Sequence, residues 1–174
     1  MKKNSFILVA LLLLGMGQSH ASSVNNQIFS VDNKDGKITA KTIEKAFNGA
    51  GVTVDVNNNM NSIFEKRYKK THHQAYNLAI FSNNELVTKL MKKYPKIGLI
   101  TPLSMSIYSN DKTNTINIST LSLKGMARVT DIPEDNPHLI AYADIVDKAL
   151  KSALPKGKYV VKHEKPIKPL YLVI

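Results

Sequence analysis

The apolar residues of this chain recur with two periods, and the two periods alternate along the sequence. Alternation at every second position is typical of half-buried strands, whereas spacings of three and four are typical of amphipathic helices. Period-two segments bounded by turn residues predict strands early in the chain and a group of strands in its middle. The predicted strands cover residues 28–31, 52–56, 76–80, 97–101, 103–107 and 116–118, and Leu121, Leu123 and Met126 are expected to continue the sheet.

Four segments with helical spacing carry start and stop signals. Thr39 is expected to cap the first helix, and Gly51 to end it as a glycine with positive φ. Residues 82–85 read as a capping box in which Ser82 caps the third helix and Glu85 reaches back. Asn136 followed by proline marks the start of the fourth. The predicted helices cover residues 40–50, 60–67, 83–94 and 137–154.

The order of these elements predicts an α+β fold. The strands in the middle of the chain follow one another with short connections, so they must pair antiparallel, and the helices then pack on one face of the sheet. We expect residues 22–155 to form a single domain that ends in the C-terminal helix. Residues 156–174 are expected to form a basic C-terminal extension.

The first 21 residues are typical of a secretory signal peptide. Lys2 and Lys3 precede an apolar run at residues 6–14, and Ser19 and Ala21 are the small residues that a signal peptidase accepts. The run is shorter than the roughly 20 residues of a membrane span, which disfavours the alternative of an uncleaved anchor. We therefore expect a periplasmic or secreted protein of bacterial origin, cleaved after Ala21 and without a later transmembrane segment.

Charge and cysteine content narrow the function further. The formal charge is +11, and without Lys2 and Lys3 there remain 22 basic and 13 acidic residues. For an exported protein this charge points away from nucleic acid and toward an anionic envelope surface or an acidic protein, unless the lysines only keep the domain soluble. The chain has no cysteine, which excludes disulfides, thiolate metal sites and a lipoprotein anchor. A small domain without disulfides is expected to gain stability as a homodimer.

Two groups of residues could bind a ligand. Ser104, Ser106 and Tyr108 alternate along one strand face and could form a polar pocket wall, although a solvated sheet face is the simpler interpretation. Exposed cations form the second group. They lie in a cluster of Lys66, Arg67, Lys69 and Lys70, and a further cluster of Lys89, Lys92, Lys93 and Lys96 would join it if the two helix ends were neighbours.

Histidines are the candidates for a metal site. His72 and His73 are adjacent, so on a strand they would point to opposite faces, and a site would need His138 or another group brought in by the fold. Residues 33–38 resemble the middle of a calcium loop, but Val31 and Thr42 stand where acidic ligands are required, so a turn is the better interpretation. Nucleophile, zinc-protease and phosphate-loop motifs are absent, and no cofactor is predicted.

Residues 76–81, the helix that Pro95 ends, and residues 97–108 together resemble a bacterial domain-of-unknown-function family, number three-zero-two. The resemblance covers roughly residues 39–119 and implies a small α+β domain with an antiparallel sheet, which is dimeric in some members. It implies no activity. Some members carry cysteines where this chain has Ser82 and Leu103, so a thiol role suspected for those members cannot operate here.

These observations favour an exported binding or accessory domain without an evident catalytic site. The alternative is a metal-dependent or hydrolytic periplasmic accessory protein that uses His72 or His73 with His138.

Overall fold

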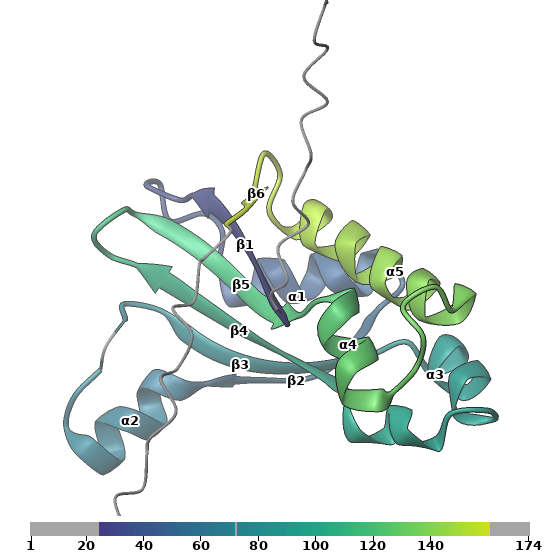
Figure 1. Cartoon of the computed structure of the whole chain (residues 1–174). Coiled ribbons are helices and arrows are strands. Elements are labelled where there is room, and N and C mark those ends of the chain that lie inside the picture. The colour runs from purple at the N-terminus through teal and green to yellow at the C-terminus, as the bar shows by residue number, and fades with distance from the viewer. Residues whose placement is uncertain (1–24, 72, 161–174) are drawn as a thin grey trace, which may run out of the picture.

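The computed structural model describes residues 25–71 and 73–160, which form one antiparallel sheet with helices on one of its faces (Figure 1). The strand order is β2-β3-β4-β5-β1-β6, and every neighbouring pair is antiparallel. This arrangement confirms the predicted α+β fold. The strands are β1 (Asn26–Asp32), β2 (Thr53–Asn59), β3 (Tyr76–Ser82), β4 (Leu103–Asn110), β5 (Thr115–Leu121) and β6 (Lys158–Tyr159).

The long helix α5 organises the helical layer. It contacts α1, α3 and α4, while α2 stands apart from this layer, beyond the point where β2 ends and β3 begins (Figure 1). The helices are α1 (Ala40–Gly49), α2 (Met60–Tyr68), α3 (Asn84–Met91), α4 (Leu123–Thr130) and α5 (Pro137–Ala153), and η1 (Pro95–Leu99) is a short 3-10 helix. None of the helices in the described residues combines the length and hydropathy that crossing a bilayer requires.

Local sequence explains where the first and last helices begin. The Thr39 and Thr42 side chains each accept from the backbone N–H of the other, which completes a capping box at the start of α1. Gly51 follows α1 with a φ of 92°, as expected for a glycine at this position. The Asn136 side chain accepts from the N–H groups of His138 and Leu139 at the start of α5.

The core lies between the sheet and the helices because inward residues alternate along the strands. Leu103, Met105 and Ile107 of β4 are almost fully buried beneath the helices, as is Ile118 of β5. The other face of the sheet carries the intervening residues, including Tyr76, Leu78 and Ile80 of β3. Of the described helices, α2 reaches this face, where the ring centroid of Phe64 lies 5.8 Å from that of Tyr76.

Three local expectations were wrong. Residues 97–101 are not a strand, because Ile97 and Ile100 donate to carbonyls three residues earlier and so extend a 3-10 turn that begins at Pro95. Leu123 and Met126 do not continue the sheet, since Ser122 caps α4 through Gly125. Asn83 rather than Ser82 caps α3, because Ser82 still pairs with β2.

Both ends of the described chain are fixed to the domain. The Asn25 carbonyl accepts from the Ser122 N–H over the first turn of α4, where the absent side chain of Gly125 leaves room for it. At the other end, the Val160 N–H donates to the Ile28 carbonyl and extends the pairing of β6 with β1. β6 is also held to α5, because the Tyr159 hydroxyl donates to Asp147 over 2.5 Å.

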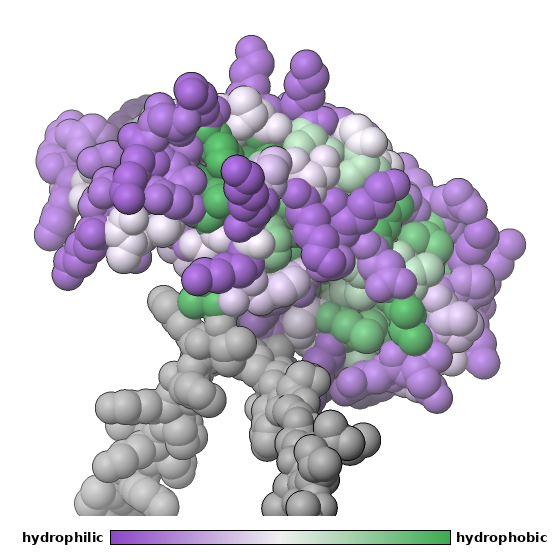
Figure 2. Space-filling model, turned by 90° about the horizontal axis from the view of Figure 1, so that it is seen from above, coloured by the Kyte–Doolittle hydropathy of each residue, from purple (hydrophilic) through white to green (hydrophobic). Residues whose placement is uncertain are grey.

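Hydrophilic residues dominate the surface seen in Figure 2, and hydrophobic side chains gather on its right, toward the end of the molecule that holds α4 and the start of α5. Val129 of α4 and Ile140 of α5 are among the exposed large hydrophobic residues, at 45% and 36%.

Candidate functional site

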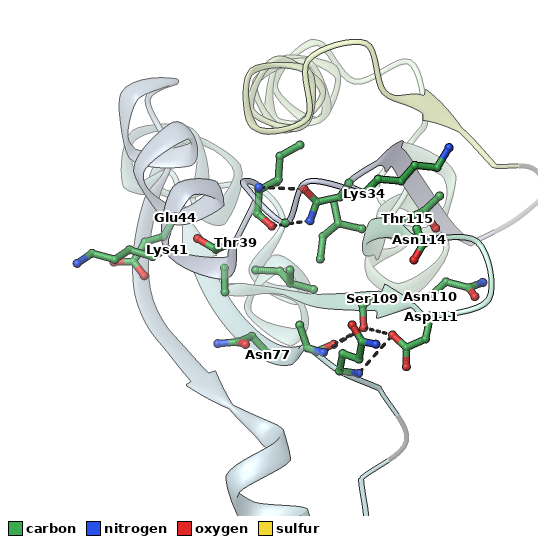
Figure 3. A pocket seen from close by; sticks show the side chains of 18 of the residues that line it. Lys34, Thr39, Lys41, Glu44, Asn77, Ser109, Asn110, Asp111, Asn114 and Thr115 are labelled. Atoms are coloured by element: carbon green, nitrogen blue, oxygen red, sulfur yellow. Dashed lines mark hydrogen bonds between the residues drawn. The ribbon is translucent and has the colours of Figure 1, made fainter.

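A cleft of about 720 Å³ lies on the helix-covered side of the sheet, beyond the point where α1 begins (Figure 3). The β1–α1 loop and the first turns of α1 form one wall. The hairpin that joins β4 and β5 forms the opposite wall, and the start of β3 closes the lower side. The cleft exists because α1 starts only at Ala40 and leaves the inward face of the strand ends uncovered.

The floor of the cleft is apolar and its walls are rich in amides. Ile38, Ile107 and Ile116 line the floor, but Ile107 and Ile116 are only 1% and 2% exposed, so the half-buried Ile38 provides nearly all of the isoleucine surface. Six amide side chains line the same space, which gives it many groups that both donate and accept hydrogen bonds. They are Asn33, Asn57, Gln74, Asn77, Asn110 and Asn114.

Asn57 connects the helix wall to the sheet. Its amide donates to the Ala40 carbonyl over 3.1 Å and to the Glu44 carboxylate over 2.9 Å. Its carbonyl oxygen accepts from the Asn77 amide over 2.9 Å. These bonds use both ends of the Asn57 amide, so they fix its orientation and hold the start of α1 in place over β2 and β3.

Asn33 shapes the loop wall. Its side chain donates to the Ile38 carbonyl over 2.8 Å and accepts from the Ile38 N–H over 3.0 Å. Gly36, with a φ of 65°, allows the tight turn between them. The Asn33 N–H donates to the Asn114 carbonyl of the hairpin. The side chain therefore serves the turn, in agreement with the interpretation of residues 33–38 as a turn and not a calcium loop.

Ser109 holds together the third side of the cleft, where the start of β3 meets the β4–β5 hairpin. Its hydroxyl accepts from the Ala75 N–H over 3.0 Å and donates to the Asp111 carboxylate over 2.8 Å. The charged groups around the cleft are Lys34, Lys41, Glu44 and Asp111, two of each sign. A balanced rim above an apolar floor favours ligands that are polar but carry no net charge.

A second, shallower hollow of about 260 Å³ lies on the open face of the sheet. His73, Tyr76, Ser106, Tyr108 and Ser119 line it. The His73 Nδ1 lies 2.9 Å from the Ser109 carbonyl, which can only accept, so Nδ1 carries the hydrogen and Nε2 is the acceptor in the neutral ring. Burial raises the pKa of the Tyr108 hydroxyl above its ordinary value.

The structure brings some of the predicted site residues together. Ser106 and Tyr108 share the hollow with His73, while Ser104 is exposed farther along the same strand face. The first basic cluster, Lys66, Arg67, Lys69 and Lys70, is exposed at the end of α2, the end that leads to His73. The second cluster follows the opposite end of β3, so the two do not form one face.

The predicted metal ligands are not assembled in the residues that the structure describes. His138 is exposed at the start of α5 in the helical layer, whereas His73 lies on the open face of the sheet. Among residues 25–71 and 73–160, no three histidine or acidic side chains lie close enough to hold an ion. His72 lies outside the described residues.

Sequence reasoning missed the cleft itself. It took residues 33–38 as a turn and ended the second strand at residue 56, because asparagine is common in turns, whereas β2 continues to Asn59. The available signal was the density of amides at the ends of predicted strands. Antiparallel pairing brings Asn57 next to Asn77 and the hairpin residues Asn110 and Asn114 to the same end of the sheet.

Comparisons with known proteins concern the family and the fold. The family model described as domain of unknown function DUF302 matches residues 29–156. The crystal structure of an uncharacterized conserved DUF302 protein from Bacillus stearothermophilus superimposes with a TM-score of 0.54 and 14% sequence identity. The match covers 73% of this chain and 94% of that one. No curated protein matches the chain.

Proposed function

The chain belongs to the DUF302 family, and from that premise we propose that it is an exported, non-catalytic binding domain whose cleft holds a small, uncharged polar ligand. The observation that carries the proposal is the amide-lined cleft of about 720 Å³. Its volume lies in the range of ligand sites in proteins, and its apolar floor with a polar rim is their usual construction.

The chemistry of the lining defines the ligand class. Amides make paired hydrogen bonds with hydroxyl and amide groups, and the half-buried Ile38 on the floor provides apolar contact area for carbon atoms. Neutral sugars, acylated amino sugars and acylated amino acid amides have this combination without a net charge. Asn57 makes its side-chain hydrogen bonds within the protein, so it is a positioning residue. Gln74, Asn110 and Asn114 also line the cleft, and they are the amides proposed to contact the ligand.

The ligand proposal is tested with N-acetylglucosamine, maltose and N-acetylalanine amide, all uncharged, titrated into ¹⁵N-labelled protein. We expect saturable amide shifts of residues in the β1–α1 loop and the β4–β5 hairpin for at least one of these probes. Asn57→Leu should abolish the shifts, because it releases α1 from the sheet. The matched control is Asn58→Leu, since Asn58 is exposed on the other face of the same strand.

A second cleft variant guards against loss of folding in Asn57→Leu. Asn77→Ala removes one donor to Asn57 and leaves the bonds to α1 in place, so it should weaken binding while the protein stays folded. Absence of saturable shifts with all three probes, or equal binding by the Asn77→Ala and Asn58→Leu variants, would contradict the assignment of the cleft.

Export is proposed from the leader at residues 1–21. When the full chain is expressed in a bacterium, we expect intact-mass measurement of the periplasmic fraction to give a protein that begins at Ser22. Recovery of the full-length chain from the cytoplasm alone would contradict this part of the proposal and leave the cleft assignment unaffected.

A further inference from the structure

We propose that the open face of the sheet and α2 together form a second binding site, which takes an anionic polysaccharide. The site is separate from the cleft, which lies on the helix-covered side of the same sheet. Two observations carry the proposal: a continuous row of aromatic rings, and cations interleaved with those rings along the chain.

The aromatic row consists of Tyr68, Phe64, Tyr76, His73 and Tyr108. The ring centroid of Phe64 lies 6.2 Å from that of Tyr68 and 5.8 Å from that of Tyr76. His73 continues the row at 5.7 Å from Tyr76 and 5.4 Å from Tyr108. The row therefore starts on α2, crosses β3 and ends on β4 at the hollow beside Ser106 and Ser119.

The local sequence explains why these rings meet. Phe64 and Tyr68 are four residues apart and so share one face of α2. Tyr76 and Tyr108 are directly opposite partners in the β3–β4 pair, which places their side chains on the same face of the sheet. The hydrogen bond from His73 to the Ser109 carbonyl fixes the imidazole between the two tyrosines.

Cations alternate with these rings in the segment that runs from α2 to β3. Lys66, Arg67, Lys69 and Lys70 all fall between Phe64 and His73, and Glu65 is the one acidic residue there. Within the described part of the chain, none of the four cations is paired with a carboxylate. The charge of these four residues is thus available to a partner, and along the chain it lies in the same segment as Phe64, Tyr68 and His73.

An anionic glycan fits this combination. The face of an aromatic ring carries partial negative charge and attracts the C–H groups of a sugar ring, while hydroxyl groups of the hollow can bond sugar hydroxyls. The unpaired cations favour sugars with carboxylate, sulfate or phosphate groups. The row reaches well beyond the hollow, so it suits a chain molecule better than a single sugar.

Single-stranded nucleic acid is the competing occupant, because it also combines stacking with negative charge. Two observations favour the glycan. The leader predicts export, and adjacent rings are inclined to each other by 36° to 67°, so neighbouring rings do not offer parallel faces to successive stacked bases.

The test measures binding of the protein lacking residues 1–21 to alginate, a polyuronate, with dextran as the neutral polymer and a single-stranded oligonucleotide as the competitor. We expect binding to alginate at low salt that weakens as salt is added, because exposed charges are screened. Binding to dextran should be undetectable. Equal binding to both polysaccharides, or tighter binding to the oligonucleotide at equal charge concentration, would overturn the proposal.

Two pairs of variants locate the contact. Tyr68 and Leu99 are similarly exposed, at 67% and 69%, so Tyr68→Ala and Leu99→Ala remove comparable surface without a folding cost. Tyr68→Ala should lower alginate affinity by about 3- to 10-fold and Leu99→Ala should not. Arg67→Gln with Lys70→Gln should weaken binding and reduce its salt dependence, while Lys92→Gln with Lys93→Gln is the charge-matched control.

Equal affinities within either pair would overturn the assignment of the aromatic row. None of these variants touches the lining of the cleft, so failure here is distinguishable from failure of the proposed ligand of the cleft.

Discussion

Tyr142 is the largest fully buried side chain among the described residues, and within them its hydroxyl makes no hydrogen bond of normal geometry. Burial raises the pKa of this hydroxyl well above its ordinary value of 10.0, and the backbone of Asn83 opposes that shift to a smaller extent. A polar atom in such a position contributes nothing at neutral pH that phenylalanine could not supply.

The pKa shift of Tyr142 predicts a dependence of stability on alkaline pH. Above pH 10 the unfolded chain releases the tyrosine proton while the folded protein retains it, so the free energy of unfolding falls as pH rises. The contribution of one such group approaches about 1.4 kcal/mol per pH unit. Urea denaturation followed by far-UV circular dichroism measures this slope, since the chain lacks tryptophan.

Tyr142→Phe is the control for this prediction. At pH 7 we expect its free energy of unfolding to equal or slightly exceed that of the unaltered protein, because the variant removes a hydroxyl without a partner. Above pH 10 the free energy of unfolding of the variant should fall less steeply with pH, because the Tyr142 hydroxyl no longer contributes to the slope. Identical slopes for the two proteins would show that Tyr142 does not titrate with folding.

At the scale of elements, the contact between Asn25 and α4 depends on one glycine. A Cβ placed on Gly125 would lie 2.0 Å from the Asn25 carbonyl oxygen and 2.8 Å from its carbon, both backbone atoms. We therefore expect Gly125→Ala to lower the free energy of unfolding by about 1–3 kcal/mol, although alanine is the better helix former. Thermal unfolding followed by circular dichroism measures the loss.

Gly49 provides the matched control for Gly125. It also lies in a helix, and nothing is within 4 Å of the Cβ that Gly49→Ala would add. That variant should leave stability unchanged or raise it by up to about 1 kcal/mol. Hydrogen exchange adds a local readout, because Gly125→Ala should accelerate exchange of the Ser122 amide, which donates to Asn25. Similar stabilities for the two alanine variants would contradict the steric argument.

Sequence reasoning located elements well where the cap and the hydrophobic period agreed. Thr39 and Asn136 were predicted correctly as caps, and the alternation of Leu103, Met105 and Ile107 gave the correct buried face. It failed where a short apolar run had no period of its own. Residues 97–101 are apolar in part and follow a proline, and a 3-10 turn and a short strand cannot be told apart on that basis.

At the scale of the whole molecule, the amide cleft and the aromatic row could not be derived from the sequence, because each joins segments that only the sheet order brings together. Ser106 and Tyr108 could be placed on one strand face from the sequence, but nothing in the sequence indicated that His73 would lie beside them. Knowledge of the β3–β4 register would have been required, since it sets Tyr76 opposite Tyr108.

The homodimer remains a prediction at this scale. Light scattering coupled to size exclusion should give twice the mass of one chain for the protein lacking residues 1–21, independent of salt if the seam is apolar. A mass of one chain across the accessible concentration range would contradict it.

The pairing of β6 with β1 has a topological consequence. Val160 bonds to Ile28, only three residues from Asn25, so the described chain leaves the sheet almost where it enters. Adjacent strands lie about 4.8 Å apart, and a linker of a few glycines could therefore join residues 160 and 25. New ends could then be opened at Lys112, in the exposed β4–β5 hairpin, without removing any strand pair. We therefore expect such a circularly permuted protein to keep the same order of strands in the sheet.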